Sequence, residues 1–266
     1  RTTWPGPCSL GSPRPPPDDA VSTSGPTRRG PMLPYDLVAG VVPCPRGWLV
    51  AGAKVLGATL APELPRVMTT FEEVLDDRPA FSIIGLYAPV GRLDDLVPGG
   101  RSCEREARAL LGTRRGAAIH SSPPRVAPPS ESLNGQADLA GQYPLGVPRK
   151  LLERYNEVDR DMAPYRQRTV FEVHPELTFY QLNEDQPLRY RKRSPEGREE
   201  RRSLLLRRIG GVDRVLDARL SGVRRSHLAD AAACMWTARR VLGRAMSRLP
   251  LDPEWDTLGL RMEFVR

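Results

Sequence analysis

Three short apolar runs at residues 37–42, 48–51 and 55–60 constrain the fold of this chain more than any other feature. The breaks between them, residues 43–47 and 52–54, carry proline or glycine, which are residues of tight turns. Apolar and β-branched runs of this length, bounded by turn residues, are typical of strands. The sequence therefore predicts a three-stranded antiparallel meander.

Strand and helix patterns alternate after this meander. His174-Pro175-Glu176 should open a helix, because proline suits the first helical position. The other predicted helices span 70–75 (capped by Thr69 or Thr70), 103–111 (closed by Gly112), 148–161, 197–209 and 226–242. The further predicted strands span 81–86, 169–173 and 261–265, the last of them an edge strand. Residues 113–146 are predicted to form a long loop. An antiparallel meander followed by alternating strands and helices predicts an α/β fold. We expect a mixed sheet, with the meander plus parallel strands, flanked by helices in the ribonuclease H-like arrangement.

The first 34 residues differ in composition from the rest of the chain. Nine of them are proline, set among serine, glycine and threonine. Such a segment buries too little apolar surface to offset its ordering entropy, so we expect residues 1–34 to be disordered and 35–266 to form one domain. This stretch lacks the pattern of a secretory signal, and the chain has no run of about eighteen apolar residues. We therefore expect a cytoplasmic protein with no membrane segment.

The four cysteines, Cys8, Cys44, Cys103 and Cys234, are widely spaced. They form no CxxC pair, so neither a zinc site nor a compact disulfide framework is predicted. Free, buried thiols are expected instead.

The chain is basic, with a formal net charge of +8, and only three of its 40 cationic residues are lysine. Arginine can bind phosphate with two parallel hydrogen bonds, so the bias favours nucleic acid as a partner. A genome rich in G and C would produce the same bias. The densest basic run contains Arg189, Arg191, Lys192, Arg193 and Arg198, and a second set at helical spacing contains Arg101, Arg105 and Arg108. Either set could equally be a solvated face.

Six segments of the chain occur in an order that resembles a known family. They lie at residues 38–48, 85–91, 100–112, 156–159, 172–198 and 230–240. Together they resemble the predicted RNase H-like nuclease family, also catalogued as domain-of-unknown-function family 429. The resemblance covers about residue 35 to the end and implies an RNase H-like domain over 35–266.

The resemblance implies a hydrolase that cleaves phosphodiesters with two divalent ions, Mg²⁺ or Mn²⁺, bridged by carboxylates. The family pattern places one aspartate at the end of the first strand and another at the end of a later central strand. This chain has Val42 and Tyr87 at those positions. An acid that precedes Asp230 in the family is replaced by His227 or Ser226. Valine has no ligand atom and a neutral phenol is a poor ligand, so we expect impaired or absent metal-dependent hydrolysis.

The acids and the histidine that remain define the candidate catalytic residues, which are Asp230, Glu172, His174 and Glu176. Asp230 and Glu172 are the candidate metal ligands. An acid in the first turn of a helix is also explained by the helix dipole, so these residues could equally be structural.

Three hypotheses follow for the function. The chain is a nuclease with a rearranged carboxylate set, a non-catalytic nucleic-acid-binding module on a nuclease-derived fold, or a degenerate protein with a structural or small-molecule role. Without nuclease activity no cofactor is expected. The candidate nucleic-acid-binding residues are Arg101, Arg105, Arg191, Lys192, Arg193 and Arg198. No oligomeric state is predicted.

Overall fold

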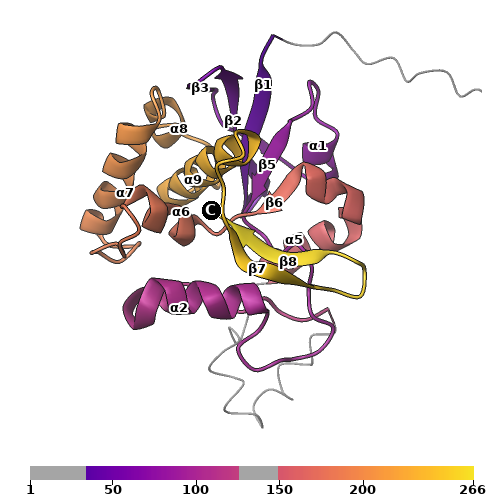
Figure 1. The fold of residues 1–266 in the computed structure, drawn as a ribbon. Coiled ribbons are helices and arrows are strands. Elements are labelled where there is room, and N and C mark those ends of the chain that lie inside the picture. The colour runs from indigo at the N-terminus through magenta and orange to yellow at the C-terminus, as the bar shows by residue number, and fades with distance from the viewer. Residues whose placement is uncertain (1–33, 126–148) are drawn as a thin grey trace, which may run out of the picture. The chain divides into compact units, whose positions relative to one another are not determined.

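The computed structural model describes residues 34–125 and 149–266 (Figure 1). The predicted disorder of residues 1–34 lies outside this range except for Pro34, and so does most of the predicted loop at 113–146. No helix in these two described ranges has the length and apolar character needed to cross a bilayer.

The predicted antiparallel meander is confirmed, with both breaks between its strands corrected. The first strand extends to Cys44 and the second begins at Gly47, so the first break covers only residues 45–46 instead of 43–47. Strand β1 (Asp36–Cys44) pairs along its whole length with β2 (Gly47–Leu56), which pairs on its other side with β3 (Thr59–Pro62) and with the short β4 (Arg66–Met68). The break predicted at 52–54 is wrong, because Gly52 lies within β2 and pairs with Ala39. The turn comes instead at Gly57, whose φ of 60° favours glycine.

Two parallel strands complete the main sheet. Strand β5 (Ile83–Leu86) pairs in parallel with β1, and β6 (Val170–Glu172) pairs in parallel with β5. The strand order is β3-β2-β1-β5-β6, which confirms the predicted mixed α/β sheet. Because β1, β5 and β6 run in the same direction, their carboxyl ends meet at one edge of the sheet, where the residues that follow them come together.

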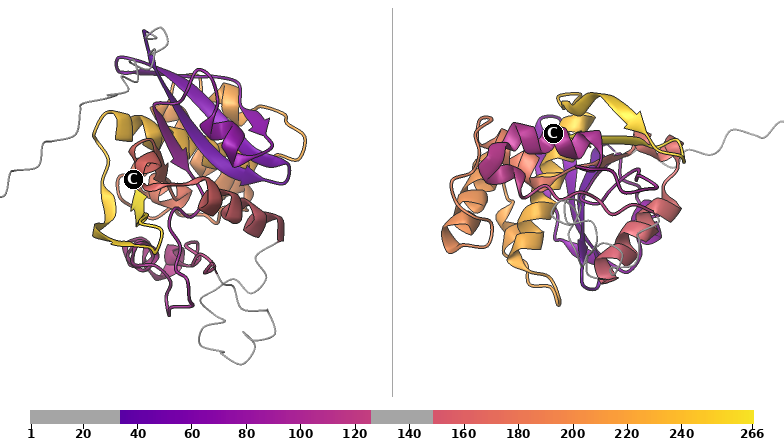
Figure 2. Two further views of the ribbon diagram at one scale, coloured as in Figure 1. Left: turned by 90° about the vertical axis from the view of Figure 1, so that its right-hand side faces the viewer. Right: turned by 90° about the horizontal axis from the view of Figure 1, so that it is seen from below.

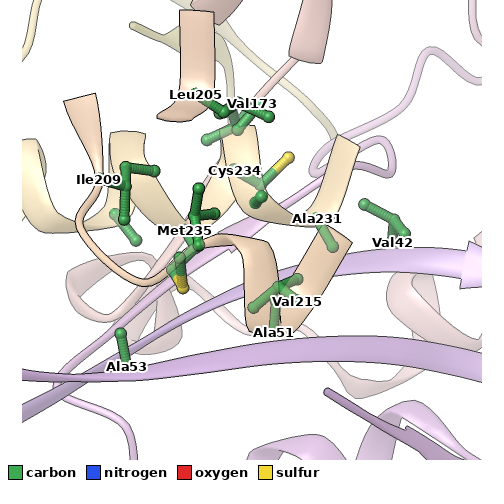
Figure 3. Close-up of a cluster of buried hydrophobic side chains, with 14 of the residues drawn as sticks. Val42, Ala51, Ala53, Val173, Leu205, Ile209, Val215, Ala231, Cys234 and Met235 are labelled. Atoms are coloured by element: carbon green, nitrogen blue, oxygen red, sulfur yellow. The ribbon is translucent and has the colours of Figure 1, made fainter. Parts of the chain in front are cut away.

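Helices cover both faces of the sheet (Figures 1 and 2). Helix α9 (Arg225–Leu242) packs directly on β1, and α6 (Pro175–Leu182), α7 (Pro195–Arg208) and α8 (Asp213–Leu216) pack around α9. The contact is close because β1 has a glycine there: a Cβ at Gly40 would lie 1.9 Å from the Ala231 carbonyl oxygen. Figure 3 shows the resulting apolar core, with Val42 of β1 beside Ala231 of α9.

The opposite face is covered by α1 (Phe71–Leu75) and α5 (Arg149–Asp161), followed by the short 3-10 helix η1 (Pro164–Arg168). Thr70, one of the two predicted caps, caps α1 by accepting a hydrogen bond from the Glu73 amide. His174 and Pro175 open α6, also as predicted.

Two elements at the strand-end edge differ from the prediction. Helix α2 (Ser102–Gly116) leaves the helical conformation at Gly112, the predicted end, but then resumes for another turn. Strand β8 (Arg261–Val265) is not an edge of the main sheet, because it pairs with an unpredicted strand, β7 (Arg248–Trp255), in a separate two-stranded ribbon. This ribbon packs against α2.

Cys44, Cys103 and Cys234 are buried free thiols, as predicted, and Cys8 lies outside the described residues.

Candidate functional site

A cleft lies where the carboxyl ends of β1 and β5 meet. The Tyr87 amide donates a hydrogen bond to the Val41 carbonyl oxygen at 2.8 Å, which fixes Tyr87 next to the end of β1. Val42, Tyr87, His174, Glu176 and Asp230 all line this cleft, whose volume is about 640 Å³. We call it the strand-end cleft. The two positions where the resemblance predicts aspartate therefore share one cavity.

Neither of these two positions supplies a good ligand for a hard metal. Val42 is 1 % exposed and belongs to the apolar core beneath α9 (Figure 3). Burial raises the pKa of the Tyr87 hydroxyl far above its ordinary value, so the phenol stays neutral. The Tyr87 ring instead packs edge-on against His174, with centroids 5.0 Å apart.

Asp230 is one of the two acids that line the strand-end cleft, and it is paired with a lysine. Asp230 lies on helix α9 with its side chain 5 % exposed, and Lys192 Nζ donates a hydrogen bond to Asp230 Oδ2 at 2.7 Å. The same ammonium lies 6.0 Å from the centroid of the Tyr87 ring. Burial raises the pKa of Asp230, and Lys192 opposes that shift. Asp230 Oδ1 has no hydrogen-bond partner within the described part of the chain.

Glu176 is the second acid of the cleft, and it is paired with an arginine. Nη2 of the buried Arg201 donates to both Glu176 oxygens, at 2.7 and 2.8 Å. The Glu176 amide donates to His174 Nδ1 at 3.2 Å, which leaves the proton of the neutral ring on Nε2. Burial and the nearby Lys192 lower the pKa of His174 to about 3, so this ring is uncharged at neutral pH.

Glu172 lies apart from the other candidate acids. Its two oxygens accept hydrogen bonds from Arg101 at 2.8 and 2.6 Å, and one of them also accepts from the Val90 amide. Glu172 lines a neighbouring cavity of about 340 Å³, which His174 also lines. The structure therefore brings His174, Glu176 and Asp230 together and holds Glu172 in a buried ion pair.

The donor set of the strand-end cleft does not fit a two-metal centre. Bridging carboxylates are needed to hold two divalent ions close together. Asp230 and Glu176 are each bonded to a cation. In the described residues there is no cluster of three or more histidine, cysteine, aspartate or glutamate side chains that could hold a metal ion.

The strand-end cleft is strongly basic. Two acids line it against seven basic residues, which are Arg114, Arg115, Arg191, Lys192, Arg193, Arg201 and Arg224. The sequence predicted three of these as nucleic-acid-binding residues, namely Arg191, Lys192 and Arg193. Arg198 lies in an adjoining pocket that shares Lys192 and Arg201 with the cleft.

Two other predicted basic residues lie elsewhere. Arg101 is buried and bonded to Glu104 and Glu172, so its guanidinium is not available to an external phosphate. Arg105 bonds to the Gly100 carbonyl and to Glu254 of β7.

Sequence reasoning missed four basic residues of the cleft, Arg114, Arg115, Arg201 and Arg224. Arg114 and Arg115 follow Gly112, where the sequence predicted that the helix ends, and the extra turn carries them to the cleft. Their side chains donate to the Arg189 and Leu188 carbonyls, which anchors α2 to the basic run. A basic pair two and three residues after the glycine that was predicted to end the helix is the signal that could have identified them.

Comparison with known proteins gives one match. The model of a family described as "Protein of unknown function (DUF429)" matches residues 36–254. No curated protein and no solved structure matches the chain. The matched range covers well over half of the sequence and includes β1, β5, α6 and α9, the elements that build the strand-end cleft. The chain therefore belongs to the DUF429 family of proteins of unknown function.

Proposed function

We propose that this protein binds nucleic acid in the strand-end cleft and that its metal-dependent phosphodiester hydrolysis is impaired or absent. The observation that carries the proposal is the charge of the cleft. Seven basic residues and two acids line it, and each acid is ion-paired with one of the seven. On this proposal the fold is that of a nuclease and the site has become a phosphate-binding surface.

The exposed arginines of the cleft are suited to phosphate. Arg191, Arg193 and Arg224 are exposed, and in the described residues no carboxylate pairs with any of them. A guanidinium group binds phosphate oxygens with two parallel hydrogen bonds, which makes arginine a common phosphate ligand. Since Asp230 and Glu176 are neutralised by Lys192 and Arg201, they do not cancel the positive field of these arginines.

Salt dependence of binding tests the nucleic-acid part of this proposal. Each lost phosphate contact reduces the slope of log affinity against log salt by about 0.7 for a single strand. The double variant Arg191→Ser with Arg193→Ser should bind a labelled single-stranded oligonucleotide more weakly, with a slope smaller by about 1.4 in fluorescence anisotropy titrations. The matched control Arg78→Ser with Arg207→Ser changes two exposed arginines that do not line the cleft. Salt-insensitive binding, or equal loss in both variants, would contradict the proposal.

Cleavage assays test the catalytic part. A nuclease with a rearranged carboxylate set remains the second candidate, because Asp230 Oδ1 is buried with no hydrogen-bond partner within the described part of the chain. We expect no cleavage of single- or double-stranded DNA or RNA with Mg²⁺ or Mn²⁺. Robust cleavage that Asp230→Asn abolishes would refute the non-catalytic assignment and establish the second candidate.

A further inference from the structure

We infer that the strand-end cleft takes an unpaired nucleotide, with its phosphate among the arginines and its base in the neighbouring aromatic cavity. This inference rests on the proposed nucleic-acid binding and adds the form of nucleic acid that is recognised. The aromatic cavity is the space of about 340 Å³ lined by Tyr87, Tyr155, His174 and Phe264, with Arg101 and Glu172 at its polar side.

The aromatic cavity and the strand-end cleft lie next to each other and share part of their lining. Tyr87, Tyr155 and His174 line both spaces, and so does Arg193. The volume of the aromatic cavity falls within the range of roughly 300–1,000 Å³ that is common for small-molecule sites. A single ligand can therefore place one part among the arginines and another part among the rings.

The aromatic cavity is built from rings that come from separate elements. Tyr87 follows β5, Tyr155 lies on α5 and Phe264 lies on β8. His174 connects two of these rings, with centroid distances of 5.0 Å to Tyr87 and 5.9 Å to Phe264. Nucleobases stack on aromatic side chains, and the stacking tolerates any base because every base has a π-face.

The strand-end cleft and the aromatic cavity differ in charge. Basic and acidic residues are equal in number in the lining of the aromatic cavity, which includes Arg101, Arg193, Glu104 and Glu172. Arg101 is bonded to both of these acids, so the polar side of the cavity carries little free charge. The strand-end cleft has five more basic than acidic residues. A phosphate is therefore favoured in the cleft and a neutral flat ring in the cavity. A base within a duplex is held by its partner, so the ligand must be unpaired.

Two single strands with equal length and equal phosphate number separate the two parts of this site. One strand carries ordinary bases, and the other carries reduced abasic residues throughout. Stacking of one base predicts that wild-type protein binds the ordinary strand roughly 5- to 150-fold more tightly. Equal affinities would overturn the base site but leave the proposed nucleic-acid binding intact. If neither strand binds, the proposed function itself fails.

A variant of Tyr155 on α5 tests whether the preference for the ordinary strand over the abasic strand comes from the aromatic cavity. Tyr155→Ala should reduce affinity for the ordinary strand to that for the abasic strand and leave the abasic strand unaffected, whereas Tyr155→Phe should bind as wild type. Tyr165→Ala is the matched control, because Tyr165 is an exposed tyrosine of η1 outside the cavity. If Tyr155→Ala weakens both strands equally, the preference for bases persists and this assignment is overturned.

A nucleoside 5′-monophosphate competitor distinguishes two sources of an unpaired nucleotide. Displacement of the ordinary strand by the monophosphate at millimolar concentration would support the site and show that a free nucleotide is sufficient. No displacement, together with the preference for the ordinary over the abasic strand, would support a base held within a strand. Tight binding of a blunt duplex with the same bases, equal to that of the ordinary strand, would overturn the requirement for an unpaired base.

Discussion

Arg101 is the central cation of a buried ion network between α2 and β6, and its removal should destabilise the protein strongly. Its side chain is 1 % exposed and bonds to Glu104 and to both oxygens of Glu172. In Arg101→Met, Glu104 keeps the hydrogen bonds from the Ser122 amide and hydroxyl. The Glu172 side chain then keeps one hydrogen bond within the described residues, the one from the Val90 amide. An almost uncompensated carboxylate is then left in the interior.

The magnitude follows from that unpaired charge. Removing one partner of a buried ion pair lowers the free energy of unfolding by about 3–5 kcal/mol. That is a large share of the free energy of unfolding of a typical protein, about 5–15 kcal/mol. For a domain of this size each kcal/mol corresponds to about 2–4 °C, so the melting temperature should fall by roughly 6–20 °C. Thermal unfolding followed by circular dichroism measures this shift.

A matched surface pair and a double variant complete the test. Arg202 makes two hydrogen bonds to Asp217, but their side chains are 34 % and 59 % exposed, so Arg202→Met should cost less than about 1 kcal/mol. Adding Glu172→Gln to Arg101→Met should recover part of the loss, because the buried charge is removed. If Arg101→Met and Arg202→Met melt within about 2 °C of each other, the reasoning from burial is refuted.

Two further predictions concern pH and close packing. The pKa of His174, lowered to about 3 mainly by burial, keeps the folded ring neutral while the unfolded ring titrates near 6.5. Its contribution to stability is therefore complete above pH 6.5 and decreases toward pH 3, by about 2 kcal/mol at pH 5. His174→Asn, which can still cap α6, should show a correspondingly flatter pH dependence in urea unfolding, and identical profiles would contradict this. Gly40→Ala should destabilise by at least about 1–3 kcal/mol, because its Cβ would meet the α9 backbone, whereas Gly210→Ala, with open space around it, should change stability little. Equal melting of the two glycine variants would contradict the close packing.

Local sequence determined most of the fold because strands and helix starts depend on neighbouring residues. The apolar runs and the turn residues between them predicted the meander, and His174-Pro175 predicted the start of α6. Where the local sequence pattern and the hydrogen-bonded pairing of strands favoured different structures, the strand pairing decided the structure. Gly52 resembles a turn residue in the sequence, but pairing with β1 on one side holds it in β2. Strand β7 has no clear alternation and forms because β8 pairs with it.

The sequence also identified where the site lies, but not its charge. The motif order placed Val42 and Tyr87 at strand ends, and the parallel pairing of β1 with β5 puts them in one cleft. The tertiary structure alone decided which basic residue pairs with each acid. Arg101 and Glu172 are 71 residues apart, and Lys192 and Asp230 are 38 apart, so no local pattern indicates that they pair. Ion pairing between distant residues depends on how helices pack on the sheet. For that reason the sequence showed an arginine-rich chain, whereas only the folded protein shows a basic cleft whose acids are already neutralised.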